Sequence, residues 1–196
     1  MKSRIIRQGL IIFVNCFGWF ILSANAQIKV KQNYIHPIII AHYDVDELEE
    51  VEKTIQENPN SAEAYLKRGL IRSHSQEDFA GAIADFTHVI DLEPSAEVYN
   101  YRGTAYFWLQ QYQNALEDYQ RAIALDQNLA IAYYNRAYVY LELGNKAGAI
   151  ADFRQGAILS QEQGDSLSYQ QALDLIQDLE IGKKKSEIMN QQTMTN

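Results

Sequence analysis

The chain has 196 residues, of which 47% are hydrophobic and 21% charged, and its formal net charge is −8. This length is enough for one domain with a sizeable core. The small numbers of glycine and proline, 10 and 3, favour helices over a loop-rich or all-β fold. The acidic balance disfavours nucleic acid and anionic lipid as partners, because both repel a negatively charged protein.

The first 26 residues have the pattern of a secretory signal peptide. A basic start with Lys2, Arg4 and Arg7 precedes an apolar run over 10–22, and the small-x-small sequence "ANA" ends at Ala26. As a helix, these 13 apolar residues would span about 20 Å, which is short of a bilayer core of about 30 Å. We expect cleavage after Ala26 and export to the periplasm or another extracytoplasmic compartment. An uncleaved membrane anchor is the alternative.

The rest of the chain repeats itself with a period of 33 or 34 residues. The recurring columns hold Tyr65, Tyr99 and Tyr133; Gly69, Gly103 and Ala137; Ala82, Ala115 and Ala149; and Phe86, Tyr119 and Phe153. Within one unit these residues recur at helical spacing on two separate stretches, with a short turn between them. Each unit is therefore predicted to be two helices whose small residues permit close approach and whose aromatic residues fill the space around them.

A unit of this length and pattern resembles the tetratricopeptide repeat. "YNYRGTAYFWLQQYQNALEDYQRAIALD" and "YYNRAYVYLELGNKAGAIADFRQGAIL" are similar to the variant found in bacterial exported proteins. The resemblance implies an all-α, right-handed α-solenoid of about three helix–turn–helix units, over 62–95, 96–129 and 130–162. Two departures are glutamines in place of the closing proline, at Gln127 and Gln161, and Gly156 in place of the usual alanine.

The flanks of the three units are interpreted as end pieces. Residues 44–61 are predicted to form a half-repeat helix, and 163–181 a C-terminal capping helix, because stacked repeats need polar outer ends for solubility. Residues 27–43 form an N-terminal extension that is a linker, an edge or an apolar segment folded back on the repeats. Residues 182–196 are expected to be a disordered tail.

Each repeat arginine is followed by an aspartate 16 or 17 residues later. A ligand site would not need this pair in all three units, whereas packing between the two helices of every unit would. We therefore expect partly buried structural ion pairs rather than contacts to an anionic ligand. The predicted pairs are Arg68–Asp85, Arg102–Asp118 and Arg136–Asp152.

The resemblance also implies a concave groove lined by the first helix of each unit. A contiguous aromatic patch there would mark an interaction site. The expected groove residues are Leu66, Leu70, Asn100, Tyr101, Thr104, Phe107, Trp108, Tyr134, Asn135 and Tyr138. The predicted function is an exported interaction module, or scaffold, that binds a protein or peptide segment on this face. The alternative is a structural or assembly subunit of an extracytoplasmic complex, whose groove is occupied by its own N-terminal segment.

Some members of the family grip a free C-terminal carboxylate with Lys, Asn and Arg in this groove. The matching positions here are Leu66, Leu70, Tyr101, Ile131 and Asn135, so that clamp is not expected. A peptide with apolar or aromatic anchors fits the pattern better. It would be mildly basic, to complement Glu63, Glu97 and Glu142.

No arrangement of residues predicts catalysis, a cofactor or a small-molecule substrate. His42, Asp44 and Asp46 alternate, but no further ligand completes a metal site. Cleavage of the signal peptide would remove Cys16 and with it any thiol chemistry. The basic cluster at 183–185 is too small to support nucleic-acid binding. The expected partner is therefore a protein or peptide, with membrane contact only if the signal segment is uncleaved.

Overall fold

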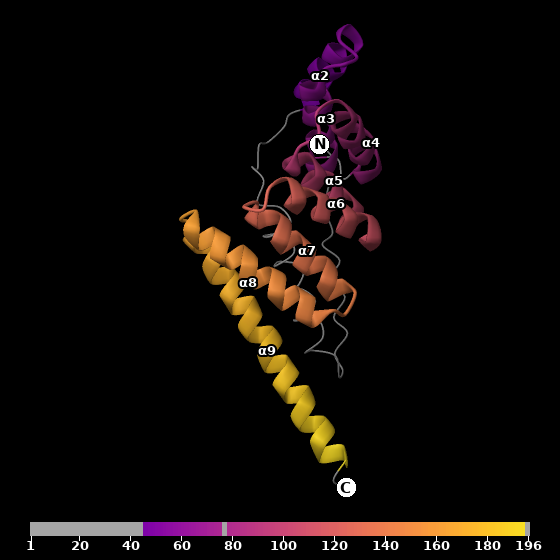
Figure 1. Ribbon diagram of the computed structural model, residues 1–196. Coiled ribbons are helices and arrows are strands. Elements are labelled where there is room, and N and C mark those ends of the chain that lie inside the picture. Colours follow the sequence, from indigo (N-terminus) through magenta and orange to yellow (C-terminus); the bar gives the residue numbers. More distant parts are fainter. Residues whose placement is uncertain (1–44, 76–77, 195–196) are drawn as a thin grey trace, which may run out of the picture.

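The computed structural model describes residues 45–75 and 78–194, and all regular structure in these ranges is helical (Figure 1). The helices are α2 (Val45–Glu57), α3 (Ala62–Ser75), α4 (Phe79–Leu92), α5 (Ala96–Trp108), α6 (Tyr112–Leu125), α7 (Ala130–Glu142), α8 (Lys146–Glu162) and α9 (Ser166–Met194). The predicted signal peptide and N-terminal extension lie outside the described residues. No helix in the described part of the chain is both long enough and apolar enough to cross a membrane.

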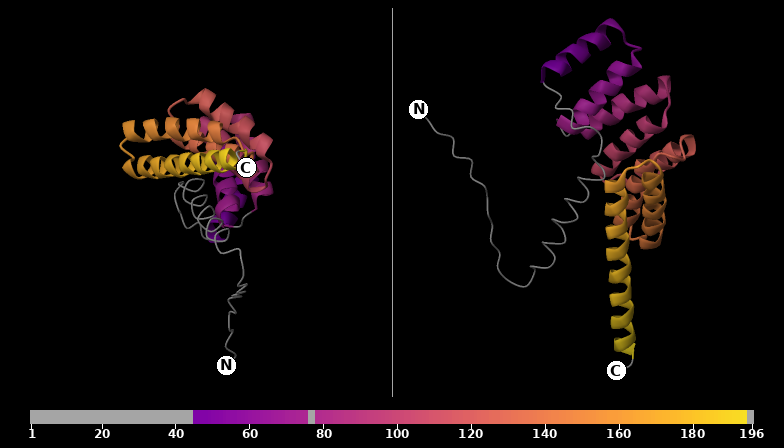
Figure 2. Two further views of the ribbon diagram at one scale, coloured as in Figure 1. Left: turned by 90° about the horizontal axis from the view of Figure 1, so that it is seen from below. Right: turned by 90° about the vertical axis from the view of Figure 1, so that its left-hand side faces the viewer.

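The helices form a solenoid in which each helix packs on the next one along the chain. Figures 1 and 2 show the stack running from α2 at one end to α9 at the other. Helix α5 also contacts α7, which places the first helices of these two units side by side. The predicted all-α solenoid is confirmed, with helix pairs α3–α4, α5–α6 and α7–α8 and one flanking helix at each end.

The two helices of a unit approach closely because small residues face aromatic ones. A Cβ atom added to Gly103 on α5 would lie 2.8 Å from Cε1 of Tyr119 on α6, closer than van der Waals contact allows. Tyr119 and its counterparts Phe86 and Phe153 are almost completely buried, as is the alanine one turn before each of them. These positions match the repeating columns of the sequence.

The turns between the paired helices depend on local polar contacts. The side chains of Asp78 and Asn145 accept hydrogen bonds from the backbone of Gly81 and Gly148, and so cap α4 and α8. In the turn before α8, Gly144 has a φ of 75°, in the left-handed region that glycine adopts without steric cost.

Gly156, the departure from the usual alanine, has a physical reason. A Cβ atom there would lie 2.5 Å from Cε1 of Tyr134, so the tyrosine ring occupies the space that the alanine methyl group would take. The phenol oxygen of Tyr134 is 2.9 Å from Oγ of Ser160, which fixes the ring at the end of α8. The equivalent residues one unit earlier are Asn100 and Ala122, so the unit without the tyrosine has the usual alanine.

Both flanking helices bury an apolar stripe. On α2, Val51 is buried and Leu48 and Ile55 pack with it against residues of α3. On α9, Ala172 and Ile176 belong to the core formed by the last units. The prediction that the chain is disordered from residue 182 is wrong, because α9 continues to Met194 and projects past α8 (Figures 1 and 2). This stretch lacks proline and is rich in the helix formers Lys, Glu, Gln and Met.

All three predicted Arg–Asp pairs are present. Arg102 on α5 donates from Nε and Nη2 to the two carboxylate oxygens of Asp118 on α6, at 2.9 and 2.8 Å. Arg136 and Asp152 repeat this geometry at 2.7 and 2.8 Å. The carboxylates are almost fully buried and the arginines are partly exposed. Two parallel hydrogen bonds fix both distance and orientation, so each pair sets how one helix lies on the other.

The first unit has an additional arginine on the same carboxylate. Arg68 donates to Asp85 through Nε and Nη2, and Arg72 donates through Nη1 to Oδ2 at 2.8 Å. The arginines also lie near tyrosine rings. The guanidinium carbon of Arg102 is 5.6 Å from the ring centroid of Tyr99, a cation–π distance.

The Arg102–Asp118 pair carries opposing electrostatic effects. Burial raises the pKa of Asp118 above its ordinary value, and the hydrogen bonds and charge of Arg102 partly oppose that shift. The hydrogen bond to Asp118 raises the pKa of Arg102, so the guanidinium stays charged. Asp118 therefore depends on Arg102 to stay ionised in its buried position.

Replacement of Gly156 tests the fit with Tyr134. Gly156→Ala should lower the free energy of unfolding by about 1–3 kcal/mol, because the added methyl group displaces the ring. In a Tyr134→Asn background the ring is gone, and the same change should stabilise by about 1 kcal/mol, since alanine is the better helix former. Urea denaturation of the four proteins measures both effects. An effect of the same sign in both backgrounds would contradict this account.

Replacement of Arg102 tests the pH dependence of the ion pair. Arg102→Gln should cost about 3 kcal/mol of unfolding free energy at pH 7, because it leaves the Asp118 carboxylate buried without its counter-charge. The folded-state pKa of Asp118 is already raised and should rise further, so protonation removes that charge as the pH falls through it. The loss should therefore shrink between pH 7 and pH 4, measured by urea denaturation against the parent protein at each pH.

Asp118→Asn is the matched control for this measurement. In that background the Arg102→Gln change should have a smaller effect that varies little with pH, because no carboxylate is left to titrate. An equal, pH-independent loss in both backgrounds would show that Arg102 acts through its packing alone.

Candidate interaction surface

A buried hydrogen-bond network joins the first helices of the second and third units. Nδ2 of Asn135 on α7 donates to Oδ1 of Asn100 on α5 at 2.9 Å, and both residues are 1% exposed. Thr104 donates to the backbone carbonyl of Asn100, and the hydroxyl of Tyr119 on α6 donates to Oγ1 of Thr104. Because buried amides are costly without partners, this network favours one relative position of α5 and α7.

Half of the predicted groove residues are buried and do not present a free surface. They are Asn100, Phe107, Tyr134, Asn135 and Tyr138. The prediction that these side chains are open to a partner therefore needs correction. The two asparagines bind each other between neighbouring helices. Tyr134 and Tyr138 pack against Phe153 on α8, and Phe107 packs against Tyr112 on α6.

The other five predicted residues are partly exposed. They are Leu66, Leu70, Tyr101, Thr104 and Trp108, and we call them the α3–α5 surface. All five lie on the first helices of the first two units. The ring centroids of Tyr101 and Phe86 are 5.8 Å apart, and the Trp108 ring stacks on Phe79 with centroids 5.9 Å apart and planes 13° from parallel. The aromatic rings are thus supported from beneath by α4 and lie in fixed orientations.

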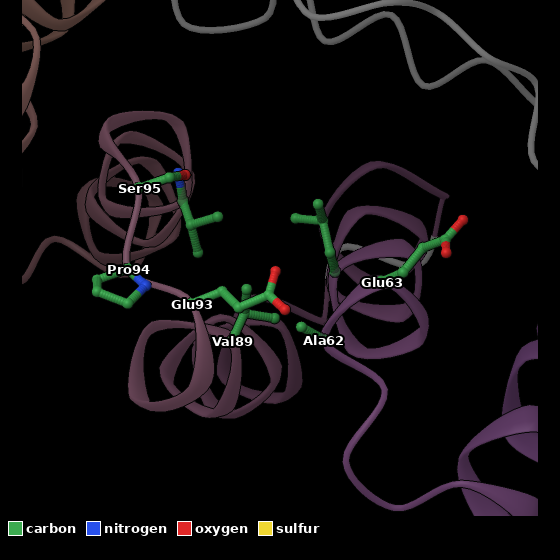
Figure 3. Close-up of a pocket in the computed structure, with 8 residues that line it drawn as sticks. Ala62, Glu63, Val89, Glu93, Pro94 and Ser95 are labelled. Carbon is green, nitrogen blue, oxygen red and sulfur yellow. The ribbon is translucent and has the colours of Figure 1, made fainter.

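A cavity of about 350 Å³ lies at one end of this surface, between α3, the end of α4 and the start of α5. Leu66, Val89 and Val98 give it apolar walls. Figure 3 shows the Glu93 carboxylate directed toward Ala62, across the gap between α4 and α3, whereas Glu63 points away. The sequence prediction named Leu66 and Glu63 at this place but missed Val89, Glu93 and Val98. The junction between repeats, "LEPSAEV", could have indicated Glu93 and Val98, because it joins the end of one unit to the start of the next.

A second cavity of about 380 Å³ lies two units further along, at the equivalent junction. Its lining includes Ala130, Ile131 and Tyr134, which correspond in the repeat to Ala62, Glu63 and Leu66. Its two carboxylates are engaged by the protein itself: Oδ1 of Asp126 accepts from the backbone of Asn128, and Oδ1 of Asp165 caps α9. One oxygen of each carboxylate is thus already hydrogen-bonded to backbone.

The described residues contain no group of three His, Cys, Asp or Glu side chains placed to hold a metal ion. The strongly perturbed buried phenol, Tyr119, has its pKa raised mainly by burial, and it lies inside the helix interface.

Comparison with known families agrees with the geometry. Residues 103–144 match a model described as TPR repeat, and 130–160 match one described as tetratricopeptide repeat. Human tetratricopeptide repeat protein 13 is 32% identical over 106 residues, a match covering 54% of this chain and 12% of that protein. Rat serine/threonine-protein phosphatase 5 is 31% identical over 101 residues, covering 50% of this chain and 20% of the phosphatase. The chain thus matches only a fraction of the length of these relatives.

Solved structures share the fold. A crystal structure of MamA superposes with a TM-score of 0.54 at 24% identity, covering 71% of this chain and 88% of that one. The TPR2B domain of yeast Sti1, in a complex with pHsp70, gives 0.58 at 22% identity over 62% of this chain and 97% of that one. The first TPR of Spaghetti (RPAP3), bound to the HSP90 peptide SRMEEVD, gives 0.56 at 21% identity over 63% and 93%. The family models thus match residues 103–160 as tetratricopeptide repeats, and the solved structures show the same solenoid fold.

Proposed function

We propose that this protein is an exported interaction module that binds a protein or peptide segment on the α3–α5 surface. The observation that carries the proposal is the set of half-buried apolar and aromatic side chains on two adjacent first helices. Domains of the same fold occur in complexes with peptides, as the Sti1 and RPAP3 structures record. Export is proposed from the signal-peptide pattern of the first 26 residues.

Rigidity of the surface supports this role. The Trp108 ring stacks on α4, the Tyr101 ring packs at a tilt against α4, and the Asn100–Asn135 hydrogen bond joins α5 to α7. A partner would therefore meet side chains that lose little conformational freedom on binding, which reduces the entropic cost of association. The face of α6 that points away from this surface is polar by contrast, with exposed Gln113, Glu117 and Gln120.

The chemistry of the surface favours an apolar, basic partner. Glu63 and Glu97 are exposed in the first turns of α3 and α5, and neither forms an ion pair with a described residue. The carboxylate-gripping positions of the family carry Leu66, Leu70 and Tyr101 at the first three places, none of them cationic. An acidic peptide such as SRMEEVD would meet negative charge here, so the ligand named for the RPAP3 structure does not transfer to this chain.

Substitution on the surface tests the proposal. Tyr101→Ala and Trp108→Ala, made singly in the full chain, should weaken capture of a cross-linked partner from the extracytoplasmic fraction at least about tenfold, the usual effect of losing a central aromatic anchor. Thermal unfolding of each variant must show that the fold persists.

Leu125→Ala is the matched control for this experiment. Leu125 is an apolar residue of α6 that is 57% exposed and lies outside the surface, so capture should be unchanged. Capture that survives both surface substitutions, or that is lost equally in the control, would favour the alternative, an assembly subunit that docks through another face.

A further inference from the structure

The cavity at the junction of the first two units combines apolar walls with two glutamates, Glu63 and Glu93, of which Glu63 points away from the gap. Ala62, Val89 and Val98 are buried, and Leu66 is half-buried beside them. The Glu93 carboxylate points into the gap (Figure 3), and it forms no hydrogen bond or ion pair with any described residue. A volume of about 350 Å³ falls within the range of roughly 300–1,000 Å³ for ligand pockets.

The electrostatics of the surrounding helix ends suit a cation. Helix α4 ends at the cavity with its carbonyl end, which carries partial negative charge. The amino ends of α3 and α5 are positive, but each has a glutamate in its first turn, Glu63 and Glu97, that offsets this charge. Ser95 Oγ already accepts a hydrogen bond from the backbone of Val98, so it does not compete for a ligand.

We infer that this cavity binds a basic side chain of the partner segment, with the aliphatic stem against Leu66 and Val98 and the charged head at Glu93. This inference rests on the proposed function, since the side chain belongs to the bound segment. Long basic side chains bury their methylene groups on apolar surface while the head remains solvated. Arginine fits better than lysine, because its planar guanidinium can pair with both oxygens of a carboxylate.

The second cavity provides an internal comparison. Ser160 stands there where Glu93 stands in the first, and Ile131 replaces Glu63. Its aspartates already accept backbone hydrogen bonds. The two cavities thus have similar volumes and equivalent positions, but the carboxylates of the second each accept a backbone hydrogen bond, whereas the Glu93 carboxylate accepts none from a described residue.

Titration with N-acetyl-arginine methylamide tests the inference directly. In amide NMR spectra of the full chain, this probe should shift Leu66, Ser95 and Val98 in a saturable manner and leave Ile131 and Ser168 unaffected. N-acetyl-citrulline methylamide has nearly the same shape without the charge. It should bind at least about threefold more weakly, in keeping with the loss of a partly exposed charge pair.

Substitution at Glu93 completes the test. Glu93→Gln should weaken arginine-probe binding by about the same factor and remove the preference over citrulline. Asp91→Asn makes the same change of charge at an exposed position of α4 that does not line the cavity, so it should leave both affinities unchanged. Equal binding of the two probes, an unchanged preference in Glu93→Gln, or the absence of saturable shifts would overturn the inference.

The outcomes separate this inference from the proposed function. If the probe fails but Tyr101→Ala still abolishes capture of the partner, the surface is the binding face and the cavity is not its basic-residue subsite. If the probe binds with the expected preference while capture is insensitive to both surface substitutions, the cavity binds a basic side chain but the proposed function fails.

Discussion

The Arg–Asp pair between the two helices of each unit is the contact on which the rest of the structure depends. Paired apolar helices can slide along each other at little cost, because dispersion and burial are not directional. A bidentate guanidinium–carboxylate bond allows one position only, and displacement would leave a buried charge unpaired. Arg102–Asp118 and Arg136–Asp152 have the same atoms in contact at nearly the same distances, so the helices of both units have the same register.

With the register of each unit fixed, variation at one repeat position changes only its local surroundings. The three equivalent residues Leu66, Asn100 and Tyr134 illustrate this. Leu66 lines the apolar wall of the cavity at its junction. Asn100 binds Asn135 on the next first helix. Tyr134 reaches α8 and occupies the volume left by Gly156. The same repeat position thus makes different contacts in successive units.

The difference between repeated contacts and local ones explains which features could be predicted from the sequence. The residue types at the positions of Arg102 and Asp118 recur in every unit, and such recurrence identifies positions that make the same contacts in each unit. The groove residues differ between units, and a helical period assigns a side chain to a face without indicating what packs on that face. Tyr138 was therefore assigned to an open groove although Phe153 lies against it. The extension of α9 beyond residue 181 was missed for a related reason, because a polar, repeat-free stretch has no apolar period to mark a helix.

The selectivity proposed for the α3–α5 surface rests on the distribution of charge. Most cations of the described chain are used internally, since the arginines of the repeat column bind their aspartates and Lys67 lies 3.7 Å from Glu47. In the described part of the chain, Glu63, Glu97 and Glu93 form no ion pair, and Glu93 lines the cavity. An interaction module of this composition discriminates mainly by repelling acidic segments, while its aromatic surface supplies affinity that depends little on sequence. In the proposed binding mode, selectivity and affinity therefore reside in separate residues, Glu93 for selectivity and Tyr101 and Trp108 for affinity.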